Sequence, residues 1–322
     1  MSSFEVVNRR TVLKQMARAA AAGTLVSGSV HAAEPTAAPA RPAQQELGSY
    51  LYARKIWVRL GDRVFTCYRA DTAQKYPYFY PVIGPASGLP LTDETCEPWP
   101  HHRSLYLGCD RVNGGNYWQD GLERGQIISR GPKLEQTKGA RIVIVDFCDW
   151  RQPDKDPILD DARRFTVVAP GPDVRLIDAD VTLTARTEVR IANTNHSFFS
   201  VRAARDMAPI GGGKLIDAHG RVGEKATFGQ AAPWCGFEAT RLGVPESIVL
   251  MHHPDNPLPD ARWFTRDYGF MSPTPFQWVG EKGWTLPAGK AIRIRYRVAV
   301  LKGLIDRSRV NQIYQEFAAA AG

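Results

Sequence analysis

The stretch Ile292-Arg293-Ile294-Arg295-Tyr296-Arg297-Val298-Ala299-Val300 decides the fold class. Apolar residues stand at every second position, and arginines fill the first three positions between them. Because successive side chains of a strand point to opposite faces, this pattern predicts an antiparallel strand with one packed face. We interpret the other face, which carries the arginines, as a solvated sheet face.

Two further stretches, residues 141–147 and 247–251, are apolar on both faces, which predicts strands inside a sandwich that are covered on either side. A helix is expected only at residues 307–320, and strands do not alternate with helices. The sequence therefore predicts an all-β fold, an antiparallel β-sandwich with a short C-terminal helix. Shorter strands are expected at residues 63–68, 164–168, 180–185, 188–191 and 198–203.

Residues 8–14 read NRRTVLK, which matches a twin-arginine export signal. A weakly apolar stretch follows, and small residues around Ala32 predict cleavage after that position. We expect a signal peptide over residues 1–32, a linker over 33–46 and a single domain over 47–322. The apolar stretch is too short for a stable membrane anchor. The expected partner is therefore the twin-arginine export machinery, and the expected location is the periplasm.

The charge argues against nucleic acid as a partner. The chain carries 41 basic and 33 acidic residues, a net charge of +8. Residues 1–32 hold four basic residues and one acidic residue, so +5 remains for the mature protein. These charges are scattered, and no predicted helix carries a basic stripe.

Four of the seven histidines lie in two adjacent pairs, His101-His102 and His252-His253. Adjacent side chains on extended backbone point to opposite faces, so we expect one histidine of each pair to face a site. Histidine exchanges protons near neutral pH, and His101, His102 and His253 are therefore candidate catalytic residues together with Arg103. The alternatives are packing roles and a divalent metal site gathered from distant segments.

Other polar residues stand among aromatic side chains, an arrangement typical of a carbohydrate cleft, where sugar faces stack on rings and hydroxyls need directed partners. The predicted substrate-binding residues are Asn113, Trp118, His196, Arg202, Glu238, Asn256, Arg266 and Tyr268. No nucleotide-binding or metalloprotease motif occurs, so no cofactor is evident, and a divalent metal stays open.

The chain resembles the PmoA-like domain family, whose function is unknown and whose members are often labelled "methane oxygenase PmoA". The resemblance extends over nearly the whole mature chain and implies a galactose-mutarotase-like supersandwich with a sugar-handling role. It rests on Tyr78-Phe-Tyr-Pro81, Gly88-Leu-Pro90, Pro100-His-His-Arg103, Val112-Asn-Gly114, Trp118, Phe199-Ser-Val-Arg202, His253-Pro-Asp-Asn256-Pro, Trp263, Arg266-Asp-Tyr-Gly269 and Arg295-Tyr-Arg297.

Together these observations predict an exported carbohydrate-active enzyme that cleaves or isomerises a glycoside or an oxidised sugar. One histidine of each pair would act as acid and base, and Arg103, Arg202 and Arg266 would orient oxygens or stabilise negative charge. The alternatives are a non-catalytic sugar-binding module and a metal-dependent lyase or oxidoreductase.

Overall fold

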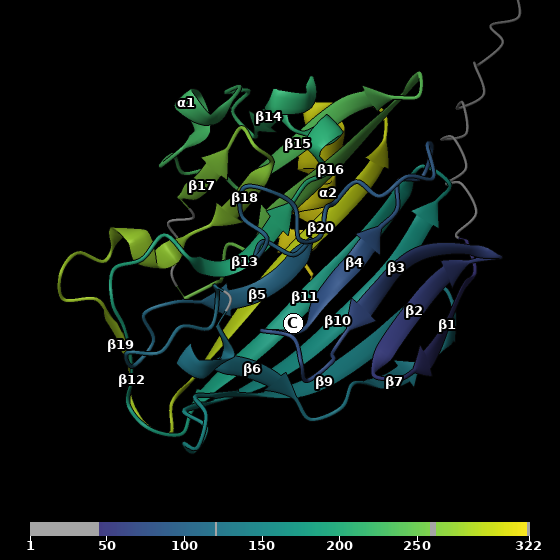
Figure 1. The fold of residues 1–322 in the computed structure, drawn as a ribbon. Coiled ribbons are helices and arrows are strands. Elements are labelled where there is room, and N and C mark those ends of the chain that lie inside the picture. Colours follow the sequence, from purple (N-terminus) through teal and green to yellow (C-terminus); the bar gives the residue numbers. More distant parts are fainter. Residues whose placement is uncertain (1–44, 120, 258–261, 321–322) are drawn as a thin grey trace, which may run out of the picture. The chain divides into compact units, whose positions relative to one another are not determined.

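Two large antiparallel sheets make up most of the computed structural model, which describes residues 45–119, 121–257 and 262–320 (Figure 1). The first sheet has the strand order β17-β18-β13-β5-β4-β3-β2-β1-β8. Its strands are β1 (Leu47–Tyr52), β2 (Lys55–Leu60), β3 (Arg63–Arg69), β4 (Tyr78–Val82), β5 (Leu105–Cys109), β8 (Lys138–Gly139), β13 (Ser197–Arg202), β17 (Trp263–Arg266) and β18 (Phe270–Pro273).

The second sheet has the order β14-β15-β16-β20-β11-β10-β9-β6, and β7 also pairs with β9. Its strands are β6 (Gln126–Ser129), β7 (Lys133–Gln136), β9 (Arg141–Arg151), β10 (Leu159–Gly171), β11 (Val174–Ala185), β14 (Lys214–Asp217), β15 (Trp234–Arg241), β16 (Val244–His252) and β20 (Ala291–Lys302). A separate two-stranded sheet joins β12 (Val189–Ile191) to β19 (Trp284–Leu286).

The helices described by the structure are few and short. They are α1 (Glu224–Thr227), α2 (Arg307–Ala318) and the 3-10 turns η2 (Leu122–Arg124), η3 (Arg205–Met207), η4 (Pro209–Gly211) and η5 (Pro275–Trp278). Asp306 caps the N-terminus of α2, because its side chain accepts hydrogen bonds from the backbone N–H groups of Ser308 and Arg309. The predicted fold class, an antiparallel β-sandwich with a short C-terminal helix, is confirmed.

Aromatic side chains join the two sheets across the core. Phe165 of β10 packs against Tyr68 of β3 and Phe79 of β4, with ring centroids 5.1 and 4.9 Å apart. At another point Tyr296 of β20 stacks on Phe199 of β13 at 5.2 Å. Tyr296 belongs to the apolar side of the alternating stretch, so this side faces the core as the sequence predicts.

The outer face of β20 and β16 carries α2, which explains why residues 247–251 are apolar on both sides. Val249 and Met251 pack outward in a second apolar cluster with Val310 and Phe317 of the helix. Arg297 is also covered there and is only 8% exposed. The interpretation of the arginine face as solvated is therefore wrong at this position, because α2 lies over it.

The other two arginines of that face form cross-strand or loop ion pairs. Arg293 pairs with Asp180 of β11, and Arg295 pairs with Asp255 at 2.8 Å. Arg297 pairs with Asp178 at 2.5 Å and donates to the carbonyl oxygen of Ile313 in α2. Thus the sheet face uses its arginines to bind neighbouring segments.

Two sequence-based expectations fall mainly outside the described residues. They are the signal peptide over residues 1–32 and most of the linker over 33–46. The described residues belong to one compact unit, and the domain boundaries stay a prediction. No helix among the described residues is long and apolar enough to cross a bilayer.

Candidate functional site

The two histidine pairs lie in different parts of the sandwich. The first pair lies in the loop before β5, whereas the second stands at the end of β16. His252 faces the core beside Tyr296, with ring centroids 5.8 Å apart, and His253 faces outward against Phe317 of α2 at 4.9 Å. The structure therefore does not bring one histidine of each pair to a common centre.

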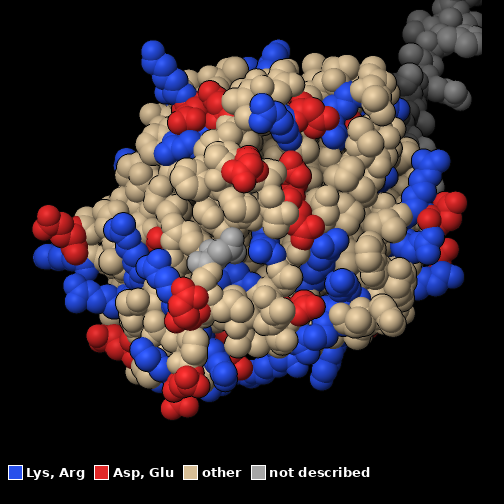
Figure 2. Space-filling model, viewed as in Figure 1, with Lys and Arg blue, Asp and Glu red and all other residues tan. Residues whose placement is uncertain are grey.

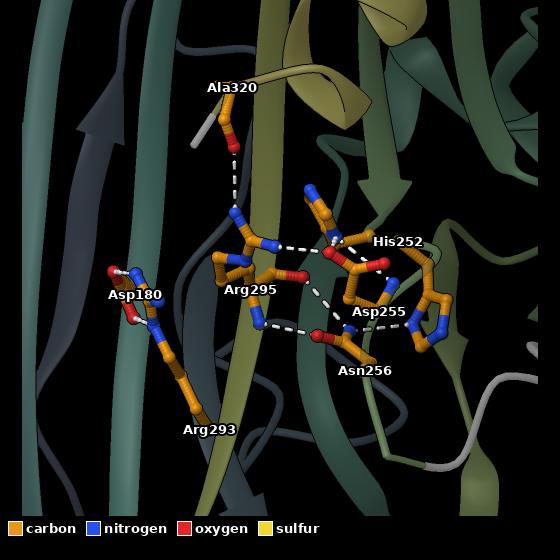
Figure 3. A network of polar contacts seen from close by, with 8 residues as sticks. Asp180, His252, Asp255, Asn256, Arg293, Arg295 and Ala320 are labelled. Carbon is orange, nitrogen blue, oxygen red and sulfur yellow. Dashed lines mark hydrogen bonds and ion pairs between the residues drawn. The ribbon is translucent and has the colours of Figure 1, made fainter. Parts of the chain in front are cut away.

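The second pair belongs to a polar network that fastens the loop after β16 to β20 (Figure 3). The side chain of Asn256 accepts a hydrogen bond from the backbone nitrogen of Arg295 at 2.7 Å and donates to its carbonyl oxygen at 3.0 Å. The amide nitrogen of Asn256 also lies 3.1 Å from Nδ1 of His252. Arg295 in turn binds Asp255 and the carbonyl oxygen of Ala320. These contacts give Asn256 a structural role, and its predicted substrate contact stays a prediction.

His253 is buried between β16 and α2. Its side chain is 0% exposed, and Nδ1 accepts a hydrogen bond from the backbone nitrogen of Asp255 at 3.1 Å. Burial lowers the pKa of His253, and the positive charge of Arg295 lowers it further against the opposing effect of Asp255. The geometry gives this histidine a neutral packing role, so its predicted catalytic role receives no support.

The first histidine pair lies at a cavity of about 280 Å³, open to solvent, near the end of the first sheet that carries β17 and β18. Four segments that are far apart in the sequence meet there. On the face shown in Figure 2, Lys and Arg side chains are interspersed with Asp and Glu. The lining residues are Trp99, His101 and His102, then Gln119, then Asn195 and His196, and finally Phe264, Arg266 and Tyr268. Five predicted site residues are therefore gathered, namely His101, His102, His196, Arg266 and Tyr268.

Strand pairing brings a carboxylate to His196. In the antiparallel pair of β5 and β13, Cys109 lies opposite Ser197. Asp110 follows the first of these and His196 precedes the second, so the two residues stand opposite each other just beyond the last strand pair. A backbone hydrogen bond of 3.2 Å from Asp110 to the carbonyl oxygen of His196 closes this end of the ladder.

The resulting His196–Asp110 pair is held from several sides. Nδ1 of His196 lies 2.8 Å from Oδ2 of Asp110, and the hydroxyl of Thr194 donates to the other carboxylate oxygen. The ring of His196 stacks on buried Trp118 at 5.4 Å. Because a carboxylate accepts the hydrogen bond, Nδ1 carries the proton and Nε2 is left to exchange one. The side chain of His196 is 23% exposed, so solvent and small molecules reach it.

His102 forms part of an aromatic floor beneath the cavity. Its ring stacks on Phe270 at 4.3 Å and lies parallel to Tyr268 at 6.2 Å. Burial lowers its pKa to about 2, and the nearby charges of His101, Arg202 and His196 act in the same direction. His102 is therefore neutral at physiological pH, and its predicted catalytic role stays a prediction.

Arg202 places a buried positive charge under this floor. It is 2% exposed, and its guanidinium lies 4.8 Å from the ring centre of Tyr268. One nitrogen donates to the carbonyl oxygen of Glu97 at 2.9 Å, while Nε and Nη1 have no hydrogen-bond partner within the described residues. Arg202 thus lies beside the site without lining the cavity, and its predicted substrate contact stays a prediction.

Two aromatic residues and an arginine shape the rim. Trp99 is 46% exposed, and Arg266 lies over the ring of Phe264 at 4.1 Å. Arg266 also binds Glu224 of α1 at 3.1 Å, which fixes the position of its guanidinium. The rim therefore offers an exposed ring face next to a fixed positive charge.

Other predicted site residues line neither this cavity nor the second one described below. Arg103 donates to Gln74, and Asn113 binds backbone atoms of Glu188 and Arg190 beside β12. Glu238 accepts a hydrogen bond from the backbone nitrogen of Ile305 at 2.7 Å. Trp118 does not line the cavity, but its ring stacks on the ring of His196.

The sequence reasoning did not single out Asp110. The only local signal is an acidic residue directly after an apolar strand, which usually indicates a turn. Trp99 and Asn195 were also missed, although each adjoins a predicted histidine segment. Within the described ranges, no three side chains of His, Cys, Asp or Glu gather so as to hold a metal ion. The divalent metal stays untested.

Remote likenesses to solved structures accompany this geometry. A GH36 alpha-galactosidase from Geobacillus stearothermophilus matches with 11% identity and a TM-score of 0.38, over 80% of this chain and 41% of that one. A putative aldose 1-epimerase from Escherichia coli K12 matches with 10% identity and a TM-score of 0.34, over 80% of this chain and 99% of that one. A polysaccharide lyase matches with 11% identity and a TM-score of 0.34, over 84% of this chain and 35% of that one.

The chain spans about two-fifths of the galactosidase's length. No activity is assigned to this chain from these likenesses, and no curated protein matches it. A family match covers residues 55–315, and it corrects the resemblance stated above. The assignment to the PmoA-like family is wrong, because the matching family is a different one. The chain belongs to the family of unknown function DUF6807.

Proposed function

We propose that this protein is an enzyme that binds a carbohydrate in the first cavity and moves protons on it with His196, which Asp110 orients. The observation that carries the proposal is the His196–Asp110 pair, a partly exposed imidazole held by a carboxylate at the wall of a cavity rimmed by an exposed tryptophan. A periplasmic location is part of the proposal and rests on the sequence of residues 1–32 alone.

The cavity combines the two kinds of group that a sugar needs. The exposed ring of Trp99 can stack on the C–H face of a pyranose, while Gln119 and Asn195 each offer amide donors and acceptors to hydroxyl groups. A volume of about 280 Å³ corresponds to roughly nine water molecules at ~30 Å³ each. The cavity thus suits one sugar residue, with further residues extending into solvent.

His196 and His102 have different proposed roles because their environments differ. His196 has a fixed ring and an available Nε2, so it is the group that accepts or returns a proton. His102 stays neutral and can only orient a hydroxyl or carbonyl group. The buried charge of Arg202 and the rim charge of Arg266 favour negative charge that develops on the bound sugar.

The lining favours proton transfer at carbon over hydrolysis by paired carboxylates. Most glycoside hydrolases use two carboxyl groups across the scissile bond, and none of the nine residues described along the first cavity is Asp or Glu. In the proposed step, Nε2 takes a proton from a carbon beside a carbonyl. The C–H electron pair becomes the double bond of an enolate, whose oxygen carries the negative charge. The carbon that loses the proton carries a hydroxyl group. Return of the proton from Nε2 to the former carbonyl carbon, while the proton of that hydroxyl passes to the enolate oxygen, moves the carbonyl to the neighbouring carbon and isomerises the sugar.

A thermal-shift screen against mono- and oligosaccharides, with and without divalent metals, tests the proposal. A ligand at about 100 times its Kd stabilises the folded state by about 2.7 kcal/mol, which raises Tm. Products of the stabilising sugars are then sought by NMR with wild type, Asp110→Asn and the exposed control His219→Asn.

We expect Asp110→Asn to lower turnover about 10²–10⁴-fold, because Asp110 sets the tautomer and orientation of His196, and the control to match wild type. Binding without turnover by wild type would indicate a sugar-binding module instead. Turnover only with an added metal would indicate the metal-dependent alternative. If no carbohydrate raises Tm, the proposal is wrong.

A further inference from the structure

A second cavity, of about 380 Å³, adjoins the first one. The two share Gln119 and His196, so they meet at the imidazole that we assign to proton transfer. Asp110, Asn116 and the glycines at 114 and 115 form part of its wall. A ligand longer than one sugar residue can therefore occupy both cavities with His196 between them.

Two guanidinium groups distinguish the second cavity from the first. Arg111 directly follows Asp110, and Arg124 ends the 3-10 turn η2. The one hydrogen bond that Arg111 makes through its side chain within the described residues goes to the carbonyl oxygen of Asn193, at 2.9 Å. The guanidinium of Arg124 forms no ion pair with any residue that the structure describes.

The carboxylate in the wall is bound by side chains other than these two arginines. Both oxygens of Asp110 are engaged, one by His196 and the other by Thr194. Its side chain is 8% exposed, and within the described residues it forms an ion pair with neither Arg111 nor Arg124. Among the described residues, two arginines without a carboxylate partner thus line one solvent-accessible cavity.

We infer that the second cavity binds an acidic sugar residue, a uronate, attached to the residue that occupies the first cavity. This inference rests on the proposed function. The fork of a guanidinium matches the two oxygens of a carboxylate, and the polar wall serves the hydroxyl groups of the same residue. The substrate class is therefore an acidic oligosaccharide.

Oligouronates provide the test, with the same oligouronates after chemical reduction of their carboxylates to alcohols as neutral counterparts. A sulfated oligosaccharide of the same length is the third probe, because a sulfate ester offers negative charge without a planar carboxylate. Binding is measured by calorimetry at low and high salt with wild type, Arg111→Gln, Arg124→Gln and the control Arg63→Gln. Arg63 is exposed, begins β3 and lines neither cavity.

We expect wild type and Arg63→Gln to prefer the oligouronate, and each cavity variant to reduce that preference about fivefold, as for an exposed ion pair. The preference should also weaken at high salt, because exposed charges are screened. Equal binding of acidic and neutral probes, a preference for the sulfated probe, or an unchanged preference in both cavity variants would overturn this inference and leave the proposed function intact. Failure of all carbohydrate probes to bind would overturn both.

Discussion

Acid should destabilise this protein through histidines that are buried in the neutral form, and His252 shows the effect most clearly. Burial lowers its pKa from 6.5 to about 3, with a smaller contribution from His253. Between pH 6.5 and about 3, His252 therefore binds a proton in the unfolded chain and stays neutral in the folded chain. The contribution of His252 to the free energy of unfolding is complete above pH 6.5 and falls as the pH drops toward 3. At pH 5 the loss is about 2 kcal/mol, because each unit of pH below 6.5 removes ~1.4 kcal/mol.

The variant His252→Leu removes this proton site. At pH 7 its stability should lie within about 1 kcal/mol of wild type, since Asn256 keeps its bond to the carbonyl oxygen of Arg295 when the bond to His252 is lost. Urea unfolding at pH 7 and pH 5, followed by tryptophan fluorescence, measures both values. Wild type should lose about 2 kcal/mol more than the variant between the two pH values. The exposed control His219→Leu should behave as wild type. An equal loss in wild type and His252→Leu would show that protonation of His252 does not cause the acid sensitivity.

Three further substitutions test the cavity rim, the contact of α2 with the sheet and a close backbone approach. Trp99→Ala should weaken sugar binding about three- to tenfold in calorimetry, because it removes the exposed ring on which the sugar would stack. Tm should stay constant, since this ring is not part of the core. Unchanged affinity would exclude stacking on this ring. Arg297→Leu should lower the free energy of unfolding by about 1–2 kcal/mol, because this residue joins α2 to the sheet. The control Arg293→Leu removes a more exposed ion pair and should change it by less than about 1 kcal/mol, so equal effects would contradict the role of the helix. Gly84→Ala would place its Cβ 2.2 Å from a carboxylate oxygen of Glu246. The variant should therefore lower the free energy of unfolding by about 1–3 kcal/mol. An unchanged urea midpoint would contradict this close packing.

The fold class could be predicted because the signal is local. Alternation from Ile292 to Val300 follows directly from the period of a strand, and the structure places Tyr296 in the core as expected. The helix at the C-terminus was also expected, but its docking face was not. Whether Arg297 and His253 meet solvent or α2 depends on how distant elements pack, which no local pattern reports.

The candidate site could be predicted only in part for the same reason. His101, His102 and His196 were singled out by their residue type and aromatic surroundings, and the structure gathers them at one cavity. Asp110 escaped notice because its importance comes from strand register. It stands 86 positions from His196 in the sequence, and only the pairing of β5 with β13 brings the two side chains together.

If His196, oriented by Asp110, moves protons on a bound sugar, one C–H proton of that sugar should exchange with solvent. Incubation of the enzyme in D2O with a sugar that raises its Tm, followed by NMR, measures this exchange as loss of the C–H signal. Wild type and His219→Asn should incorporate deuterium at the same rate. His196→Asn should exchange about 10²–10⁴-fold more slowly while still binding the sugar. Exchange by His196→Asn at the wild-type rate, or no exchange by wild type, would contradict proton transfer by His196.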